Sequence, residues 1–80
     1  MMADARRDTR HRVLKTGTIE FGGGAIDCTI RNLSPSGAGL QVESQTGIPD
    51  RFTLVMPADG LHMPCHITWR RACRIGVAFD

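Results

Sequence analysis

Two groups of residues in the first half of the chain have side chains suited to an anionic ligand that also forms hydrogen bonds. Basic residues gather near the N-terminus, and a polar, glycine-rich segment spans residues 32–39. Guanidinium groups bind phosphate bidentately, stack on purine faces and pair with the O6 and N7 atoms of guanine. An amide offers a donor and an acceptor to a base edge, and glycine permits close approach of the backbone. The combination indicates a site for a guanine nucleotide that carries phosphates.

The basic group contains half of the ten arginine and lysine residues of the chain, and only Asp8 opposes it locally. Its members are Arg6, Arg7, Arg10, Arg12 and Lys15. Such a cluster is typical of a solvated tail or of an anion site for phosphates or nucleic acid. Because residues 1–12 show no apolar periodicity, we expect a flexible arm that becomes ordered against the rest of the chain when a ligand binds.

The polar segment contains the pattern Asn32-x-Ser34-x-x-Gly37 between two stretches of apolar alternation. Alternation over residues 25–33 and 39–43 predicts two half-buried strands, so the segment is interpreted as the loop that joins them. In a loop, the amide of Asn32, the hydroxyl of Ser34 and the backbone at Gly37 are available to a ligand. The alternative is an ordinary hairpin connection, since serine, proline, glycine and asparagine are common turn residues.

The elements that must position these groups are short strands with period-two patterning. They are expected at residues 13–21, 25–33, 39–43, 52–56, 63–69 and 75–79. No segment shows a helical stripe of apolar residues. A chain of 80 residues, 41% of them hydrophobic, makes one small domain. Its sheet must close to bury an apolar face and remove its edges, so we predict an all-β, six-stranded antiparallel barrel over residues 13–80.

The three cysteines, Cys28, Cys65 and Cys73, do not suggest a disulfide framework, because their number is odd and no C-x-x-C occurs. Cys28 and Cys65 are in phase with apolar neighbours and are interpreted as core residues in a reducing compartment. No apolar run approaches the roughly 20 residues of a membrane span, and the N-terminus lacks the apolar region of a signal peptide. A cytoplasmic location is therefore expected.

Neither catalysis nor metal binding is expected. His62-x-x-Cys65-His66 brings three possible ligands together, but alternation along a strand turns Cys65 away from both histidines, and zinc needs convergent ligands. No motif places Ser34 beside a base and an orienting group, as a hydrolase would require.

The chain resembles the PilZ domain family, which binds cyclic di-GMP in bacteria. Arg6-x-x-x-Arg10 matches the R-x-x-x-R motif of that family, and the pattern at Asn32, Ser34 and Gly37 matches its [D/N]-x-S-x-x-G motif. The ending at residues 75–79, Ile-Gly-Val-Ala-Phe, is similar to the last strand of the family. The six-strand pattern agrees with its barrel as well.

The resemblance implies a stand-alone receptor or adaptor that binds cyclic di-GMP between the arm and the polar segment, needs no cofactor, and signals to an unidentified effector protein. Arg6 and Arg10 would contact phosphates and guanines, Asn32 and Ser34 would read a guanine, and Gly37 would keep the loop open.

Many members of the family place the second motif arginine directly before the first strand. Arg12 occupies that position here, and Arg7 is followed four residues later by His11 instead of an arginine. Arg7 and Arg12 are therefore alternatives to the Arg6 and Arg10 pair, or assist it.

Two other functions remain open on the sequence. The first is a β-barrel that binds single-stranded nucleic acid, which the basic arm favours. Such barrels usually expose aromatic side chains for stacking, whereas this chain has no tyrosine and all its aromatic residues fall in the apolar phase, so nucleic acid is not the expected partner. Those residues are Phe21, Phe52, Trp69 and Phe79. The second is a PilZ-like interaction module that has lost its ligand.

Overall fold

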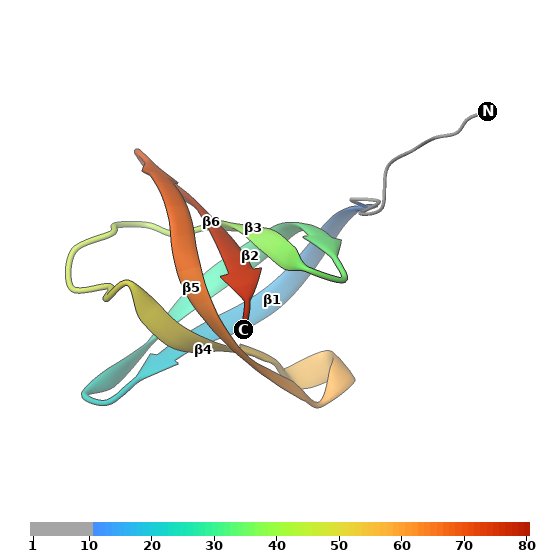
Figure 1. The fold of residues 1–80 in the computed structure, drawn as a ribbon, viewed down its shortest axis with the longest axis horizontal. Coiled ribbons are helices and arrows are strands. Elements are labelled where there is room, and N and C mark those ends of the chain that lie inside the picture. The colour runs from blue at the N-terminus through green and yellow to red at the C-terminus, as the bar shows by residue number, and fades with distance from the viewer. Residues whose placement is uncertain (1–10) are drawn as a thin grey trace.

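A computed structural model, which describes residues 11–80, shows a closed barrel of six antiparallel strands (Figure 1). The strands are β1 (His11–Phe21), β2 (Gly24–Ser34), β3 (Gly37–Gln41), β4 (Arg51–Met56), β5 (Leu61–Arg71) and β6 (Arg74–Phe79). A 3-10 turn, η1 (Pro57–Asp59), links β4 to β5. Around the barrel the strands follow the order β1-β2-β3-β6-β5-β4, so the predicted fold class is confirmed. Residues 11–80 include no helix long and apolar enough to cross a bilayer.

The proposed arm falls largely outside the described residues, and so do Arg6, Arg7 and Arg10. Strand β1 begins at His11, whereas the apolar pattern placed its start at Val13. Arg12 therefore belongs to the barrel, where it pairs with Asn32 of β2. Polar residues can extend the strand because neighbouring strands are joined by backbone hydrogen bonds, which do not require apolar side chains.

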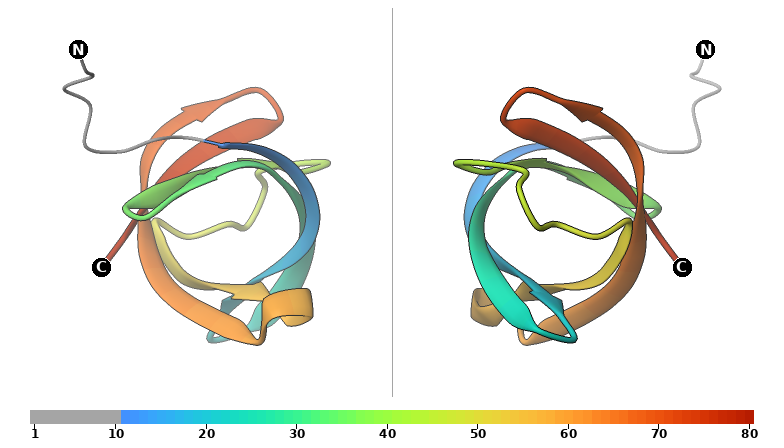
Figure 2. Two further views of the ribbon diagram at one scale, coloured as in Figure 1. Left: turned by 90° about the vertical axis from the view of Figure 1, so that its right-hand side faces the viewer. Right: turned by 90° about the vertical axis from the view of Figure 1, so that its left-hand side faces the viewer.

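Closure of the barrel joins the first strand to the fourth, with Thr18 opposite Val55 and Glu20 opposite Thr53. The connection between β3 and β4 crosses one end of the barrel (Figure 2). It inserts Ile48, which is 5% exposed, into the core. All six strands thus have two neighbours, and the sheet has no free edge.

The core is made of side chains that point into the barrel from every strand. Its largest fully buried side chains are those of Ile19, Ile30, Leu40, Leu54, Cys65 and Ile75. The prediction that Cys28 and Cys65 are core residues is confirmed, since both are buried and neither is part of a disulfide. Burial raises the pKa of the Cys28 thiol to about 12 and that of the Cys65 thiol to about 11. Both groups are thus neutral packing residues at neutral pH.

Bulges interrupt the alternation in three strands, and each inserts one extra residue. The register shifts lie between Arg12 and Lys15 of β1, between Ile30 and Asn32 of β2, and between Ile67 and Trp69 of β5. A one-residue shift sends every following side chain to the opposite face. In β2 it turns Leu33 toward the core.

The bulge in β5 makes the expectation for Trp69 wrong. Strict alternation placed Trp69 in the core with Met63, Cys65 and Ile67, but the indole is on the outside and is 48% exposed. Thr68 is the extra residue, and its hydroxyl donates a hydrogen bond to the carbonyl oxygen of Gly76 at 3.2 Å.

The interpretation of residues 32–39 as a loop is also wrong. Strand β2 continues to Ser34 and β3 begins at Gly37, which leaves Pro35 and Ser36 as the whole connection. Asn32 pairs with Gly39, and Ser34 pairs with Gly37. The segment is a tight hairpin, because its polar residues join the ladder through the backbone.

Candidate functional site

Five strands each contribute one residue to a single row across the outside of the barrel. Arg12 of β1 is opposite Asn32 of β2, which is opposite Gly39 of β3. Gly39 is opposite Gly76 of β6, which is opposite Trp69 of β5. Directly paired residues share one face of a sheet. We call this set of five residues the wall row.

Two glycines occupy the centre of the wall row, and a planar side chain lies over each. A β-carbon on Gly39 would come within 2.5 Å of Nδ2 of Asn32, and one on Gly76 would overlap the indole Nε1 of Trp69. The amide and the indole therefore rest on bare backbone in positions that only glycine permits. The row combines a hydrogen-bonding group and an aromatic surface on neighbouring strands.

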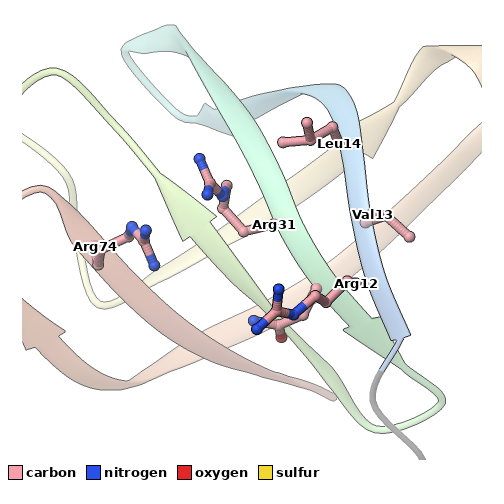
Figure 3. A pocket seen from close by; sticks show the side chains of 6 residues that line it. Arg12, Val13, Leu14, Arg31 and Arg74 are labelled. Atoms are coloured by element: carbon pink, nitrogen blue, oxygen red, sulfur yellow. The ribbon is translucent and has the colours of Figure 1, made fainter.

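An open hollow with a volume of about 620 Å³ lies over β1, β2 and β6 and is lined by Arg12, Arg31, Asn32 and Arg74 together with Val13 and Leu14. Figure 3 shows the three guanidinium groups, contributed by β1, β2 and β6, around the same face. Arg31 donates a hydrogen bond to Oε1 of Gln41 at 2.9 Å, which positions its side chain along the sheet. Among residues 11–80, no carboxylate lines this hollow, and its three guanidinium groups favour an anion.

A second hollow of about 400 Å³ adjoins the other end of the wall row and is lined by Trp69, Arg70, Arg71 and Arg74. The guanidinium group of Arg70 turns away, since it donates to Oδ1 of Asp50 at 2.8 Å and to the carbonyl of Ile48 at 3.1 Å. Arg71 and Arg74 are directly paired across β5 and β6.

The positive charge along the wall row is not neutralised by carboxylates of the barrel. Within residues 12–80, the basic partners in ion pairs are Lys15, Arg51, His66 and Arg70. Arg12, Arg31, Arg71 and Arg74 are not among them. Guanidinium groups without a carboxylate partner can exchange water for phosphate oxygens without breaking an existing ion pair.

A further hollow of about 880 Å³ lies along β2 and β3, but its electrostatics are opposite. Its lining includes Asp27 and Glu43 and, within the part of the chain that the structure describes, no arginine or lysine. Two carboxylates disfavour a phosphate there. This hollow has a larger volume than the two basic hollows, but the charges along the wall row make the wall row the better candidate site for an anionic ligand.

The structure separates the predicted site residues into two groups. Arg12 and Asn32 lie in the wall row. Ser34 is buried, and its hydroxyl accepts a hydrogen bond from the amide of Gly37 at 3.2 Å and lies 3.3 Å from the Gly37 carbonyl oxygen, to which it can donate. Gly37 has no space for a β-carbon, which would overlap the carbonyl oxygen of Val77. Ser34 and Gly37 therefore hold the hairpin that carries Asn32.

Sequence reasoning missed Trp69, Arg31 and Arg74 as site residues. The local signal for Trp69 was its position directly before two arginines, which is unusual for a core residue. The bulges that turn Asn32 and Trp69 outward leave no mark in the sequence that alternation can detect.

The groups gathered in the wall row are of the kinds that bind ligands through hydrogen bonds, charge and stacking. Among the described residues, no three histidine, cysteine or acidic side chains are arranged to hold a metal ion. His66 lies with its Nδ1 atom 2.8 Å from Oδ1 of Asp80 and lines neither basic hollow. Guanidinium groups, an amide and an indole can together bind a ligand that is both anionic and planar.

These features define a class: a small antiparallel barrel with a basic, glycine-centred face on its outer wall. Comparison with known protein families matches residues 4–80 to the PilZ domain. The match covers nearly the whole chain, and the chain belongs to the PilZ domain family. Members of this family in general bind cyclic di-GMP and act as non-catalytic modules. No curated protein matches the chain.

Proposed function

We propose that this chain is a non-catalytic receptor for cyclic di-GMP and that the ligand binds over the wall row. The observation that carries the proposal is the placement of Arg12 and Asn32 at one side of two bare glycines and of Trp69 at the other. A cyclic dinucleotide offers what these groups recognise: two phosphates, two purine faces and two guanine edges.

The phosphates are assigned to the arginines around the Asn32 end of the wall row. Arg12, Arg31 and Arg74 line the hollow there, and the basic residues 6–10 directly precede β1 in the chain. A hydrogen bond to a charged group contributes about 1.5–3 kcal/mol. Two such contacts and one aromatic contact of about 1–3 kcal/mol amount to about 4–9 kcal/mol, and micromolar binding corresponds to about 8.2 kcal/mol, so we assign the phosphates to more than two arginines.

The bases are assigned to Asn32 and Trp69. The amide of Asn32 can donate to and accept from a guanine edge, and the exposed indole offers a face for stacking. Stacking of a base on an aromatic side chain contributes about 1–3 kcal/mol. Gly39 and Gly76 leave the space in which the amide and the indole lie against the barrel wall, and so position both groups for a base.

Signalling is assigned to the residues before β1. Arg6, Arg7 and Arg10 would contact the phosphates together with Arg12 and so draw the N-terminal segment onto the wall row. The surface formed by ligand and segment would then bind an effector protein, in keeping with an adaptor that acts in the cytoplasm. Ordering a segment on a ligand is a common switching device, because the ligand supplies contacts that the free segment lacks.

Calorimetric titration of the purified chain with cyclic di-GMP at physiological salt tests the proposal. GTP serves as the comparison ligand, because it offers one guanine and no cyclic backbone. Arg51→Ala is the control variant, since Arg51 is paired with Asp80 and lines neither basic hollow. We expect saturable binding of cyclic di-GMP by the native chain and by the control, and much weaker binding of GTP. The proposal would be contradicted if cyclic di-GMP produced no heat of binding at concentrations up to the millimolar range.

A further inference from the structure

The outer surface around Trp69 extends the basic face beyond the hollow assigned to the dinucleotide. Strands β5 and β6 continue to a tip that projects from the barrel (Figure 1). Arg71 and Arg74 lie at this tip, opposite one another in the ladder. Trp69 and Arg71 share a face because they are two residues apart on one strand. The exposed indole is thus bordered by guanidinium groups on the side away from Asn32.

The two basic hollows adjoin one another at Arg74, which lines both. Within residues 11–80, no acidic residue lines either hollow. From Arg12 on β1 to Trp69 on β5 the face follows the curved wall of the barrel across four strand spacings, a contour of roughly 19 Å at about 4.8 Å each. A face of this length exceeds what a single compact anion needs.

We propose that this face also binds single-stranded nucleic acid, and that a cyclic dinucleotide competes with it. An exposed aromatic ring among guanidinium groups is the arrangement by which sequence-tolerant single-strand binders hold unpaired bases and phosphates. The alternation of the sequence disfavoured such binding, because it predicted that every aromatic side chain faces the core. Exposure of the Trp69 indole removes that objection.

The physical roles follow from position. Trp69 stacks on one unpaired base, and Arg71 and Arg74, which are paired at the tip, contact phosphates next to that base. Arg12 and Arg31 extend the phosphate contacts toward β1. A duplex binds less well, because its bases are stacked on one another and are not available to the indole.

The experiment titrates the full chain with a fluorescently labelled single strand of mixed sequence, roughly 4–16 nucleotides long. Anisotropy reports binding, and the emission of the single tryptophan reports stacking on Trp69. For three or four neutralised phosphates, the logarithm of the binding constant should fall with the logarithm of salt concentration at a slope of about −2 to −3. Unlabelled cyclic di-GMP should displace the strand, and the matching duplex should bind at least fivefold more weakly.

Variants separate this function from dinucleotide binding. Trp69→Leu should weaken single-strand binding at least fivefold, and Trp69→Phe should retain most of it. Arg71 lines the hollow beside Trp69 but not the hollow beside Asn32. Arg71→Ala should therefore reduce the salt dependence of single-strand binding by about 0.7 in slope without weakening the binding of cyclic di-GMP. Arg51→Ala should change neither. The proposal is overturned if the strand does not bind even at low salt, if Trp69→Leu binds it as well as the native chain, or if cyclic di-GMP binds without displacing it.

Discussion

The indole of Trp69 lies directly over Gly76, in the space that a β-carbon on Gly76 would occupy. The two residues are opposite one another on β5 and β6, immediately after the bulge at Thr68. The position of the only tryptophan on the barrel wall thus depends on the absence of a side chain on the neighbouring strand.

Gly76→Ala should therefore weaken cyclic di-GMP binding at least tenfold, because the added methyl group displaces the indole from the wall row. A tenfold loss corresponds to about 1.4 kcal/mol, within the range for one stacked base. Calorimetry measures the affinity, and tryptophan emission shows whether the indole has moved. Gly22→Ala is the matched control, since nothing lies within 4 Å of a β-carbon there. If Gly76→Ala bound cyclic di-GMP with the affinity of the native chain although its emission spectrum had shifted, Trp69 would not be part of the binding site.

Ser34→Ala should reduce the stability of the free protein. The buried hydroxyl accepts from the amide of Gly37, and its removal leaves that amide without the partner. A buried group left unsatisfied costs about 1–3 kcal/mol, which lowers the melting temperature by about 4–8 °C per kcal/mol in a domain of this size. Asn32→Ala should destabilise less and weaken cyclic di-GMP binding more. Thermal melting and calorimetry on both variants check this contrast, and an unchanged melting temperature in Ser34→Ala would contradict the structural role.

Alternation was sufficient to predict the barrel, because the inward residues of most strands keep the period of two up to the bulges. Ile26, Cys28 and Ile30 follow it, and beyond Arg31 the phase changes. The position of a bulge depends on how several strands fit together around the closed barrel. The sequence of one strand does not contain that information. The orientations of Asn32 and Trp69 depend on two such bulges and could not be derived locally.

The motifs predicted which residues belong to the site, and that prediction remains to be tested, but the sequence could not separate the roles of the motif residues that the structure describes. Ser34 and Gly37 have the chemistry of ligand-binding residues, yet the first is buried and the second packs against the backbone of β6. Arg31 directly precedes the motif residue Asn32 on β2, whereas Arg74 is distant from the motifs in sequence. Arg74 lines the same hollow as Asn32 because β3 alone separates β2 from β6 in the barrel.

Arg12→Ala should weaken cyclic di-GMP binding at least tenfold, because Arg12 lies beside Asn32 in the wall row. Motif spacing makes the same prediction for Arg10→Ala, since loss of a charged contact costs about 1.5–3 kcal/mol. Calorimetry on the two single variants decides which arginine contributes more. Unchanged affinity in Arg12→Ala, with a large loss in Arg10→Ala, would place the phosphates away from the wall row.

Alkaline pH should reduce the stability of the barrel through its buried thiols. Burial raises the pKa of Cys28 to about 12 and of Cys65 to about 11, from an ordinary value of 9.0. Above pH 9 the unfolded chain releases these protons while the folded chain retains them. The stabilisation is therefore complete below pH 9 and decreases as the pH rises toward the folded-state values, by up to about 1.4 kcal/mol per pH unit for each thiol.

Urea denaturation between pH 7 and pH 11 measures this dependence. The chain has no tyrosine and a single lysine, so few other side chains obscure the effect. Cys28→Val should give a shallower decrease than the native chain, because one of the two thiols is removed. A free energy of unfolding that stays constant from pH 8 to pH 11 would show that the thiols ionise as readily in the barrel as in the unfolded chain.

The most direct test of the ligand site is a titration of isotopically labelled protein with cyclic di-GMP, followed by amide and indole resonances. The account predicts that the largest chemical-shift changes occur at the amides of Asn32, Gly39 and Gly76 and at the indole N–H of Trp69. Residues of the acidic hollow, such as Asp27 and Glu43, should change little. Largest changes around Asp27 and Glu43, with the wall row unaffected, would contradict the assignment of the wall row as the binding site.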